Sequence, residues 1–336
     1  MTVGGPVPLD TLNLSLGVVV IGRNEGERLR ACLLSVLSPG RPVVYVDSGS
    51  SDGSVATAQS LGADVCRLDM TLPFTAARAR NEGFRRLRAI RPGVDVVQFV
   101  DGDCEVVPGW LSEAVEFLRA TPQVAAVCGR RRERYPERSV YNLLCDLEWN
   151  TPVGVARACG GDVAIRAVAM EAVGGFRDEL IAGEEPELCI RLRAAGWLIW
   201  RLDVDMARHD AAMTRFAQWW TRATRAGFAY AQGRQLHGGP PERHWVRESR
   251  SAVVWGLGLP LLLLSLVAFA GPLALVGFLI YPMQGLRLYL KGRGSGRERA
   301  ISATFLLLGK FAEAAGVVRF HVQRLLRTTP RLIEYK

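Results

Sequence analysis

The sequence predicts an α/β domain with a mostly parallel central sheet, followed by a membrane-associated helical region. Three observations carry this prediction. Short β-branched runs alternate with helical periodicity through the first half of the chain. Acidic residues stand at the ends of two of those runs, where ligands collect in parallel sheets. After Val253 the chain becomes strongly apolar, and a hydrophobic content of 49% exceeds what a soluble enzyme needs.

The strands and helices of the predicted domain follow one another in a regular order. Strands are expected at 16–21, 43–46, 63–66, 94–100, 124–128 and 197–202, and helices at 27–37, 52–59, 76–90, 110–119, 168–173 and 186–195. Strands separated by helices indicate parallel crossovers. Asp47 and Asp101 then fall at the carboxyl ends of their strands. Asp52 is the expected N-cap of the helix that follows the second strand.

The chain divides into five parts by composition. They are an N-terminal lead (1–14), a catalytic domain (15–212), amphipathic interfacial helices (213–250), a transmembrane or re-entrant hairpin (251–290), and a basic amphipathic helix with a tail (291–336). The hairpin breaks at Gly271-Pro272, and basic residues flank its outer ends but not its turn, so both ends are expected in the cytoplasm. For residues 214–235, an ordinary core helix is the alternative to an interfacial one.

The last apolar stretch, 301–318, is expected to lie in the membrane interface. It contains Lys310 and Glu313 and is followed by further basic residues, which a third crossing would export. Because 42 Lys and Arg face 33 Asp and Glu, the net charge is +9, and many basic residues flank the apolar tail. We therefore expect an anionic lipid surface and no nucleic acid as partner, with a merely solvated basic face as the alternative.

The cysteines and the N-terminus bear on the compartment. The seven cysteines are scattered and never form C-x-x-C, which indicates neither a zinc site nor a disulfide framework and fits a reducing compartment. The first fifteen residues lack a signal-peptide pattern. The expected location is the inner or cytoplasmic membrane, with the catalytic domain facing the cytoplasm.

Asp101-Gly102-Asp103 is the strongest candidate for a chemical site. Mg²⁺ and Mn²⁺ sites typically use one or two carboxylates together with substrate phosphates, and the glycine lets the backbone approach those phosphates. A D-x-D pattern alone is common. Its place directly after a buried strand makes it informative.

Four segments together resemble a known family. They are VVVIGRNEGERLRACLLSV (18–36), VVYVDSGSSDGSVATA (43–58), ARARNEGF (77–84) with QFVDGDCEVVPGWL (98–111), and GGDVAIRAVAMEAVGGFRDELIAGEEPELCIRLRAAGW (160–197). In their order and spacing the chain resembles glycosyltransferase family 2, the inverting enzymes with a glycosyltransferase A fold, and among them membrane-associated enzymes of exopolysaccharide or glycolipid assembly.

The resemblance implies a donor site and a divalent cation. Residues implied near the donor are Arg23, Glu25, Asp47, Arg80, Asn81, Asp101, Gly102 and Asp103. Asp101 and Asp103 match the pair that binds Mg²⁺ or Mn²⁺ and the donor phosphate. A carboxylate at a strand end can accept hydrogen bonds from a base or a ribose hydroxyl. For Asp47, an Asx turn that closes the strand is the alternative. His209 is similar to a histidine that serves some enzymes of this fold as an extra metal ligand, with a structural role as the alternative.

The segment GEEPELCIRLRAAGW matches the family's Glu-Asp motif and supplies the candidate general base. Glu185 is that candidate, and Glu184 beside it would raise its proton affinity. Glutamate stands where the family has aspartate, which leaves open which of the two contacts the acceptor. An acidic helix N-terminus with Pro186 in the first turn is a second interpretation, and both can hold together.

The acceptor side is implied to include residues from the second half. They are Gly161, Asp162, Arg191, Trp219 and Trp220. Gln218-Trp219-Trp220 with Arg222 loosely resembles the Q-x-x-R-W segment of processive synthases, but the spacing differs, and two membrane segments cannot enclose a polymer channel. A single addition is therefore expected.

The predicted activity is transfer of one sugar, with inversion, from a uridine or guanosine diphosphate sugar to a lipid-linked or membrane-proximal saccharide. A nucleotidyltransferase and a non-catalytic membrane scaffold remain as alternatives. The former needs a Gly-rich triphosphate loop, and GRNEGER supplies only two spaced glycines. The sugar, the base, the acceptor and the oligomeric state stay open.

Overall fold

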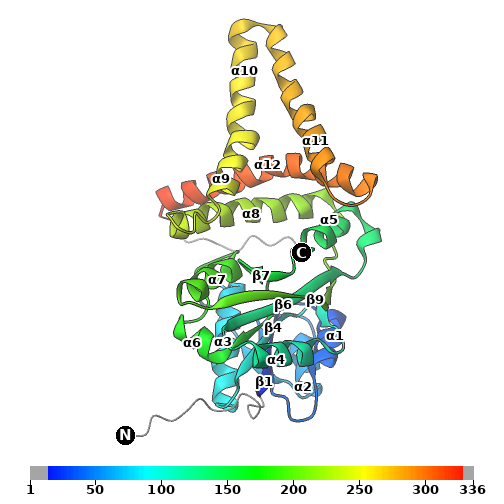
Figure 1. The fold of residues 1–336 in the computed structure, drawn as a ribbon, viewed down its shortest axis with the longest axis vertical. Coiled ribbons are helices and arrows are strands. Elements are labelled where there is room, and N and C mark those ends of the chain that lie inside the picture. The colour runs from blue at the N-terminus through cyan, green and yellow to red at the C-terminus, as the bar shows by residue number, and fades with distance from the viewer. Residues whose placement is uncertain (1–13, 328–336) are drawn as a thin grey trace. The chain divides into compact units, whose positions relative to one another are not determined.

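The computed structural model describes residues 14–327, which fall into two compact units (Figure 1). The first unit comprises 14–134, 146–179 and 184–211, and the second comprises 135–145, 180–183 and 212–327. Residues 1–13 of the predicted lead and 328–336 of the predicted tail lie outside the described residues.

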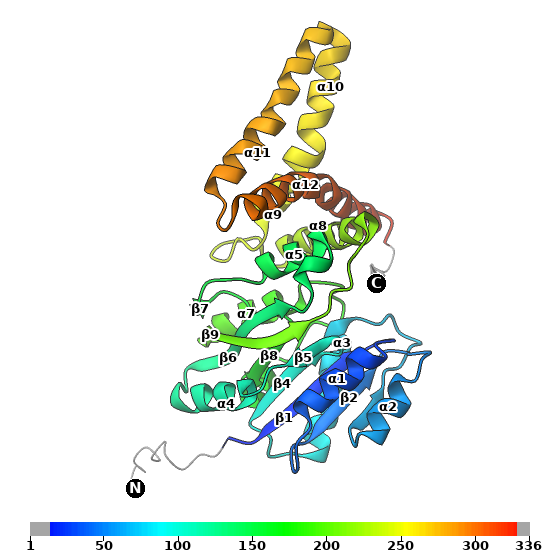
Figure 2. The ribbon, with the colours of Figure 1, turned by 90° about the vertical axis from the view of Figure 1, so that its right-hand side faces the viewer.

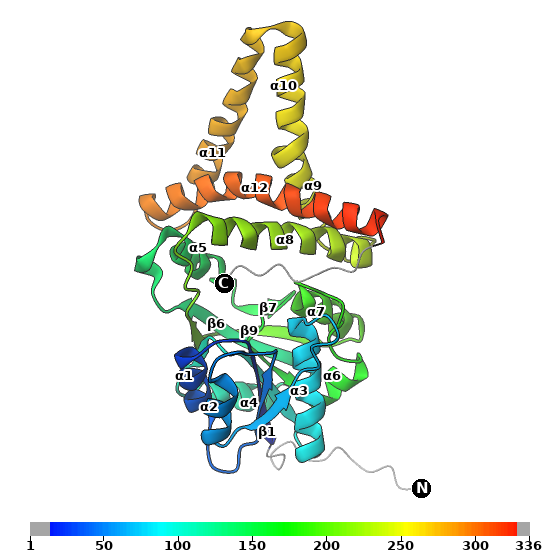
Figure 3. The ribbon, with the colours of Figure 1, turned by 180° about the vertical axis from the view of Figure 1, so that it is seen from behind.

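The first unit is built on a mixed sheet with helices on both faces, α4 in front in Figure 1 and α3 in front in Figure 3. Its strands are β1 (Leu16–Gly22), β2 (Val43–Asp47), β3 (Asp64–Arg67), β4 (Val96–Asp101), β5 (Cys104–Val106), β6 (Val124–Glu133), β7 (Gly154–Ala156), β8 (Val163–Arg166) and β9 (Leu198–His209). Its helices are α1 (Glu27–Val36), α2 (Ser54–Ser60), α3 (Ala76–Ile90), α4 (Trp110–Ala120), α6 (Ala167–Ala172) and α7 (Glu184–Ala194).

The strand order is β3-β2-β1-β4-β8-β6-β9-β5, with β7 also pairing with β9. The first four strands in that order are parallel, and β8 is antiparallel to both β4 and β6. The predicted α/β class with a mostly parallel sheet is confirmed. The crossover helices account for this arrangement, because a parallel pair cannot be joined by a tight hairpin.

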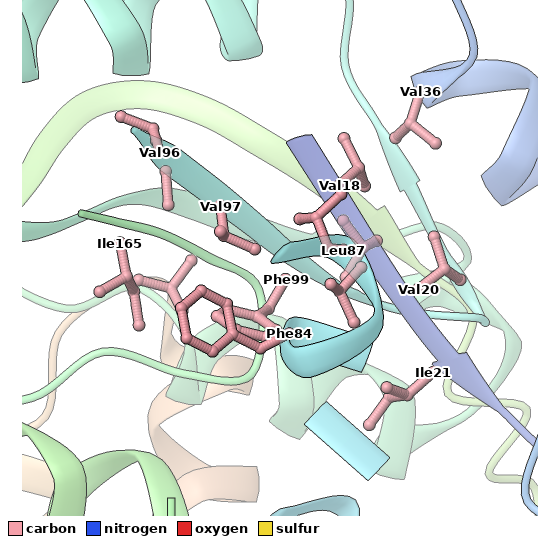
Figure 4. Close-up of a cluster of buried hydrophobic side chains, with 14 of the residues drawn as sticks. Val18, Val20, Ile21, Val36, Phe84, Leu87, Val96, Val97, Phe99 and Ile165 are labelled. Carbon is pink, nitrogen blue, oxygen red and sulfur yellow. The ribbon is translucent and has the colours of Figure 1, made fainter. Parts of the chain in front are cut away.

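The core forms where β1, β4 and α3 meet, as the cluster in Figure 4 shows. The β-branched run of β1 is buried from Gly17 to Ile21, as expected for a strand covered on both faces. Helix α3 begins where the Thr75 side chain accepts a hydrogen bond from the backbone N–H of Arg78 at 3.1 Å. Gly83 lies directly over β1 and β2, since a Cβ there would collide with Val19 and Val46.

Strand register brings the predicted acidic strand ends to one edge of the sheet. Gly22 pairs with Asp47 across β1 and β2, and Ile21 pairs with Asp101 across β1 and β4. The Gly102 N–H then donates to the Ile21 carbonyl at 2.8 Å. The turn that carries Asp101, Gly102 and Asp103 is therefore fixed to the carboxyl end of β1.

Several predicted boundaries are wrong. β6 continues to Glu133 and β9 to His209, well past the expected ends at Cys128 and Leu202, because their last residues are polar and break the apolar pattern. α7 begins at Glu184 rather than at Pro186. Asp52 is not the N-cap, which is Gly53, although Asp52 Oδ1 accepts a hydrogen bond from the Ser54 N–H at 2.9 Å.

The second unit is helical. It contains the start of α5 (Val140–Glu148), then α8 (Phe216–His237), α9 (Val246–Val253), η3 (Val254–Gly258), α10 (Leu259–Ala270), η4 (Pro272–Leu279), α11 (Ile280–Lys291) and α12 (Gly296–Leu325). α8 and α12 lie side by side, and the hairpin of α10 and α11 extends away from both (Figures 1, 2 and 3). The chain reverses at Gly271, whose φ of 87° favours glycine.

Three stretches of this unit are long and apolar enough to cross a membrane: Val246–Ala270, Pro272–Lys291 and Gly296–Leu325. The hairpin exposes its large apolar side chains, with Phe269 92% and Leu273 82% exposed. α12 differs, because it packs on α8 through glycines. A Cβ at Gly316 would collide with the Thr224 carbonyl, and one at Gly227 with the backbone of Glu313.

Candidate active site

A buried guanidinium joins the acidic strand end to the two glutamates of α7. Arg80, on α3, donates from Nη2 to Asp101 Oδ1 at 2.7 Å and from Nη1 to Glu184 Oε1 at 2.8 Å. The same Nη1 lies 3.0 Å from Glu185 Oε1. Burial alone would lower the pKa of Arg80, but Glu185, Asp101 and Glu184 outweigh it and raise that pKa above its ordinary value. Arg80 is therefore a permanent positive charge that holds three carboxylates together.

A second arginine completes the surroundings of Asp101. Arg131, on β6, places Nε 2.8 Å from Asp162 Oδ2 and Nη2 3.4 Å from Asp101 Oδ2. Asp162, which is fully buried, also accepts the Asp101 backbone N–H at 2.9 Å. The carboxylate of Asp101 is thus held between Arg80 and Arg131.

Asp103 faces a histidine rather than an arginine. His209, the last residue of β9, places Nε2 3.2 Å from Asp103 Oδ2. On its other side, Nδ1 lies 3.5 Å from Oε2 of Glu133, the last residue of β6. All three side chains are buried. The two aspartates of the D-G-D turn therefore stand in different chemical settings.

The two glutamates of α7 differ in environment. The Glu184 side chain is 4% exposed and that of Glu185 is 13% exposed, so Glu185 is the one with more access to an incoming group. Burial, followed by the charge of Glu184, raises the pKa of Glu185 to about 7, against the opposing effect of Arg80. A carboxylate with that pKa is matched to general-base work near neutral pH.

Gly161 has no room for a side chain. A Cβ there would fall on Arg80 Nη2, 2.9 Å from Asp101 Oδ2 and 3.0 Å from Glu185 Oε1. A Cβ at the neighbouring Gly160 would meet no atom of the described residues within 4 Å. Gly161 therefore lies at the centre of the charge cluster formed by Arg80, Asp101 and Glu185.

Glu25 and Arg23, which the resemblance also implies near the nucleotide, make side-chain contacts close to the strand ends. The Glu25 side chain packs against Gly102, whose Cβ would lie 3.3 Å from Glu25 Cγ, and it pairs with Arg28 at 2.8 Å. Arg23 is exposed and its guanidinium stands 5.2 Å from the centre of the Phe74 ring. Both contact residues at or near the carboxyl edge of the sheet.

Asp47 and Asn81 are engaged with the backbone. Asp47 Oδ2 accepts hydrogen bonds from the N–H groups of Gly49 at 3.1 Å and Ser50 at 3.0 Å, which is the Asx turn that the sequence offered as the alternative. The Asn81 amide bonds to both the N–H and the carbonyl of Phe176. These contacts order the loops around the site.

The predicted acceptor residues have different surroundings. Gly161 and Asp162 lie in the charge cluster, whereas Arg191 donates to Glu187, with Nη2 2.6 Å from Oε2, one turn earlier on α7. Trp219 and Trp220 belong to the second unit. There the Trp219 ring packs against Phe305 of α12, with ring centres 4.8 Å apart, so this part of α8 includes core packing.

Part of the chain is similar to known glycosyltransferases. Residues 17–154 match the family model described as glycosyl transferase family 2. The chain is also 25% identical, over 197 residues, to the glycosyltransferase AglE of Haloferax volcanii. That alignment covers 54% of this chain and 62% of AglE, so the chain spans less than two thirds of this relative.

Two solved structures share the fold at low identity. One is the mannosyltransferase PcManGT from Pyrobaculum calidifontis in complex with GDP-Man and Mn²⁺, with a TM-score of 0.64, 18% identity, and coverage of 93% of this chain and 88% of that one. The other is S. aureus TarS 1-349, with a TM-score of 0.51, 14% identity and 91% coverage of each chain. The predicted glycosyltransferase A fold is confirmed.

The site contains a donor set that fits a divalent cation. Ligand atoms of Asp103, Cys104 and His209 all lie within 4.8 Å of one another, as do those of Asp101, Cys104 and Asp162. Burial and the nearby aspartates raise the pKa of the Cys104 thiol, and Mg²⁺ and Mn²⁺ prefer oxygen ligands to sulfur. Carboxylate oxygen and imidazole nitrogen remain, and they suit Mg²⁺ or Mn²⁺. Asp101 is less suited, because two arginines already share its carboxylate.

Sequence reasoning missed two residues of the candidate active site, Arg131 beside Asp101 and Glu133 beside His209. Both lie on the polar end of β6, in the run RRRE, where no apolar alternation marks a strand. The spacing still carries a signal, because Arg131 and Glu133 are two residues apart and every second residue of a strand faces the same side. The strand VAIR (163–166) was too short to be recognised next to Asp162.

Proposed function

We propose that this chain is a metal-dependent, inverting glycosyltransferase that transfers one sugar from a nucleoside diphosphate sugar. The observation that carries the proposal is the buried Arg80, which binds the strand-end Asp101 and Glu185 with one guanidinium. Arg80 thereby holds Asp101, on the donor side, close to Glu185, whose pKa is raised to about 7. Burying charge costs free energy even when the charges are paired, and clusters of this kind with a shifted pKa are most common at functional sites.

In the proposed mechanism Glu185 removes the proton of the acceptor hydroxyl. The oxygen then displaces the nucleoside diphosphate at the anomeric carbon from the opposite face, which inverts its configuration. Arg80 keeps the Glu185 carboxylate in place, and Glu184 raises its affinity for the incoming proton. Asp103 and His209 would hold the cation, which when bound neutralises the charge of the departing diphosphate.

For the donor we propose a UDP- or GDP-sugar, with Mn²⁺ or Mg²⁺. Support comes from PcManGT, whose structure contains GDP-Man and Mn²⁺ and whose fold is similar over most of both chains. Glu25, Gly102 and Arg23 lie near the carboxyl edge of the sheet, which is where nucleotides bind in open α/β sheets.

For the acceptor we propose a lipid-linked or membrane-proximal saccharide. The exposed apolar hairpin of α10 and α11 is suited to hydrocarbon, and basic residues flank its outer ends only, which supports a catalytic domain on the cytoplasmic side. α12 runs alongside α8, away from the direction of the hairpin (Figure 1), and pairs Lys310 with Glu313 at 2.6 Å. Both features favour an interfacial position for α12.

A groove in the second unit supports a lipid partner. It has a volume of about 440 Å³ and lies among α8, α9, η3 and α12. Val253, Leu257 and Val318 line it together with Arg234 and His321. This combination suits a hydrocarbon chain with an anionic head group.

The test is a thermal-shift panel of nucleotide sugars with Mn²⁺, followed by transfer from the donor that stabilises the chain to a lipid extract of the membranes of the source organism. Binding stabilises the native state by mass action. We expect one donor to raise the melting temperature only with metal present, and one product heavier by a single sugar with inverted anomeric configuration. Pyrophosphate release from a triphosphate would instead indicate a nucleotidyltransferase, and absence of any metal-dependent nucleotide binding would indicate a scaffold.

A further inference from the structure

His209 is held between two carboxylates on opposite sides of its ring. Nε2 lies 3.2 Å from Asp103 Oδ2, and Nδ1 lies 3.5 Å from Glu133 Oε2. The Trp149 ring packs edge-on against the imidazole, with ring centres 4.9 Å apart. The ring therefore has a defined plane, with one nitrogen toward the D-G-D turn and the other toward β6.

Glu133 is built into the interior of the sheet. Its side chain is 0% exposed, and β6 pairs it directly with His209 of β9. Oε2 accepts the Ala211 N–H at 3.1 Å, which anchors the carboxylate beyond the histidine. Burying the Glu133 carboxylate costs free energy unless a partner offsets the cost. Nδ1 of His209 is the imidazole atom that faces this carboxylate.

The arrangement has a chemical consequence for His209. A neutral imidazole has one N–H and one lone pair, and a carboxylate can only accept. With the N–H at Nδ1 directed at Glu133, the lone pair of Nε2 points toward Asp103. Carboxylates in this position are known to fix the orientation and raise the basicity of metal-binding histidines. At 3.5 Å the Nδ1–Oε2 contact is not a hydrogen bond, and Nδ1 is a buried atom without a hydrogen-bond partner among the described residues. Glu133 is the carboxylate that lies in reach of this atom.

We propose that Glu133 is a positioning residue, which fixes the tautomer and orientation of His209 so that Nε2 and Asp103 together bind the divalent cation. The inference rests on the proposed function, because it takes the cation site as given. It adds a residue that does not touch the metal and that the family motifs do not mark.

The test is Mn²⁺ binding to the purified full chain, followed by electron paramagnetic resonance of free Mn²⁺. Loss of an outer partner typically weakens metal affinity about 10- to 100-fold, and we expect Glu133→Gln to raise the Kd for Mn²⁺ by about 10-fold or more. In a His209→Ala background, the same Glu133→Gln change should have little further effect, because its influence passes through the imidazole. Nitrogen modulation of the bound Mn²⁺ signal should be present in the wild type and absent from His209→Ala.

Glu105→Gln is the matched control. Glu105 lies on β5, which neighbours β9, and its carboxylate pairs with Arg134 at 2.9 Å. Glu105→Gln removes the same charge from a side chain that is engaged with an arginine instead of His209, so the Kd for Mn²⁺ should stay near that of the wild type. If Glu133→Gln reduces the yield of folded protein, Glu133→Asp, which draws the carboxylate back from Nδ1, repeats the test. An equal loss for Glu133→Gln with and without His209, or an unchanged Kd, would overturn the inference.

Failure of the proposed function has a different pattern. If wild type and Asp103→Asn bind Mn²⁺ equally, the cation site itself is elsewhere and both proposals fall. If Asp103→Asn and His209→Ala lose Mn²⁺ while Glu133→Gln does not, only the role of Glu133 is wrong.

Discussion

The two units of this chain depart from an ordinary soluble protein in opposite ways. In the first, charged side chains such as Arg80, Asp103 and Glu184 are buried, and in the second, large apolar side chains such as Phe269 and Leu273 are exposed. Burying charge and exposing apolar surface are each unfavourable in water. The difference indicates two separate surroundings: a preorganised polar site in one unit and hydrocarbon around the other.

Placing charge on the exposed apolar hairpin of the second unit should have the largest effect. Each arginine near the middle of a membrane helix opposes insertion by about 2.5–3.5 kcal/mol, so the double change Leu261→Arg with Leu264→Arg should oppose it by roughly twice that. We expect this variant to leave the membrane fraction after an alkaline wash. Both leucines are 55% exposed.

Leu34→Arg supplies the control for that experiment. Leu34 is 51% exposed on α1 of the first unit, close to the exposure of the two hairpin leucines. Its replacement should leave membrane association and melting temperature almost unchanged. Equal behaviour of Leu34→Arg and the hairpin variant would remove the distinction between the two units.

The next largest effect should be the loss of kcat when the buried charge of Glu185 is removed. Glu185→Gln removes the proposed base and should lower kcat by about 10²- to 10⁴-fold while donor binding is retained. Steady-state kinetics with the identified donor measures it. Glu187→Gln is the comparison on the same helix: Glu187 is also buried, but it pairs with Arg177 and Arg191 away from the cluster. Glu187→Gln should lower the melting temperature and leave kcat unchanged. A large loss of kcat in Glu187→Gln with a normal kcat in Glu185→Gln would contradict the assignment of Glu185 as the base.

Adjacent glycines test how tightly the charge cluster is positioned. Gly161→Ala should displace Arg80 and Glu185 and reduce kcat by about 10²-fold, since misplacement by about 1 Å can cost that much. Gly160→Ala, which meets open space, should stay near the wild-type rate. Equal rates for the two variants would show that the cluster tolerates displacement.

The smallest effect expected is the pH dependence. Because the pKa of Glu185 is raised to about 7, the carboxylate binds a proton below that pH and can no longer accept one from the acceptor. We expect kcat/KM to be level above pH 7 and to fall about tenfold per unit below it. A pH–rate profile at constant free Mn²⁺ measures this, and an acid limb near pH 4.5 would contradict the environment described for Glu185.

The sequence predicted the site's position better than its internal contacts. Asp101 could be placed at a strand end because VDVVQFV (94–100) is a mostly apolar, valine-rich run that ends there. Which carboxylate meets an arginine and which meets a histidine depends on β6 and β9, whose polar ends carry no apolar alternation. Arg191 lay in a matching motif, yet Glu187 one turn earlier binds it, a choice that helical spacing permits but does not impose. The choice between Glu184 and Glu185 required their exposures.

Nucleoside diphosphate release from nucleotide sugars tests the central claim most directly, because it needs no knowledge of the acceptor. Wild type, Asp103→Asn and Glu185→Gln are each incubated with UDP- and GDP-sugars and Mn²⁺, with and without a chelator. The account predicts slow release of UDP or GDP from at least one donor by the wild type, abolished by chelation and by Asp103→Asn. Release that is unaffected by both, or none from any donor with metal and lipid extract present, would contradict it.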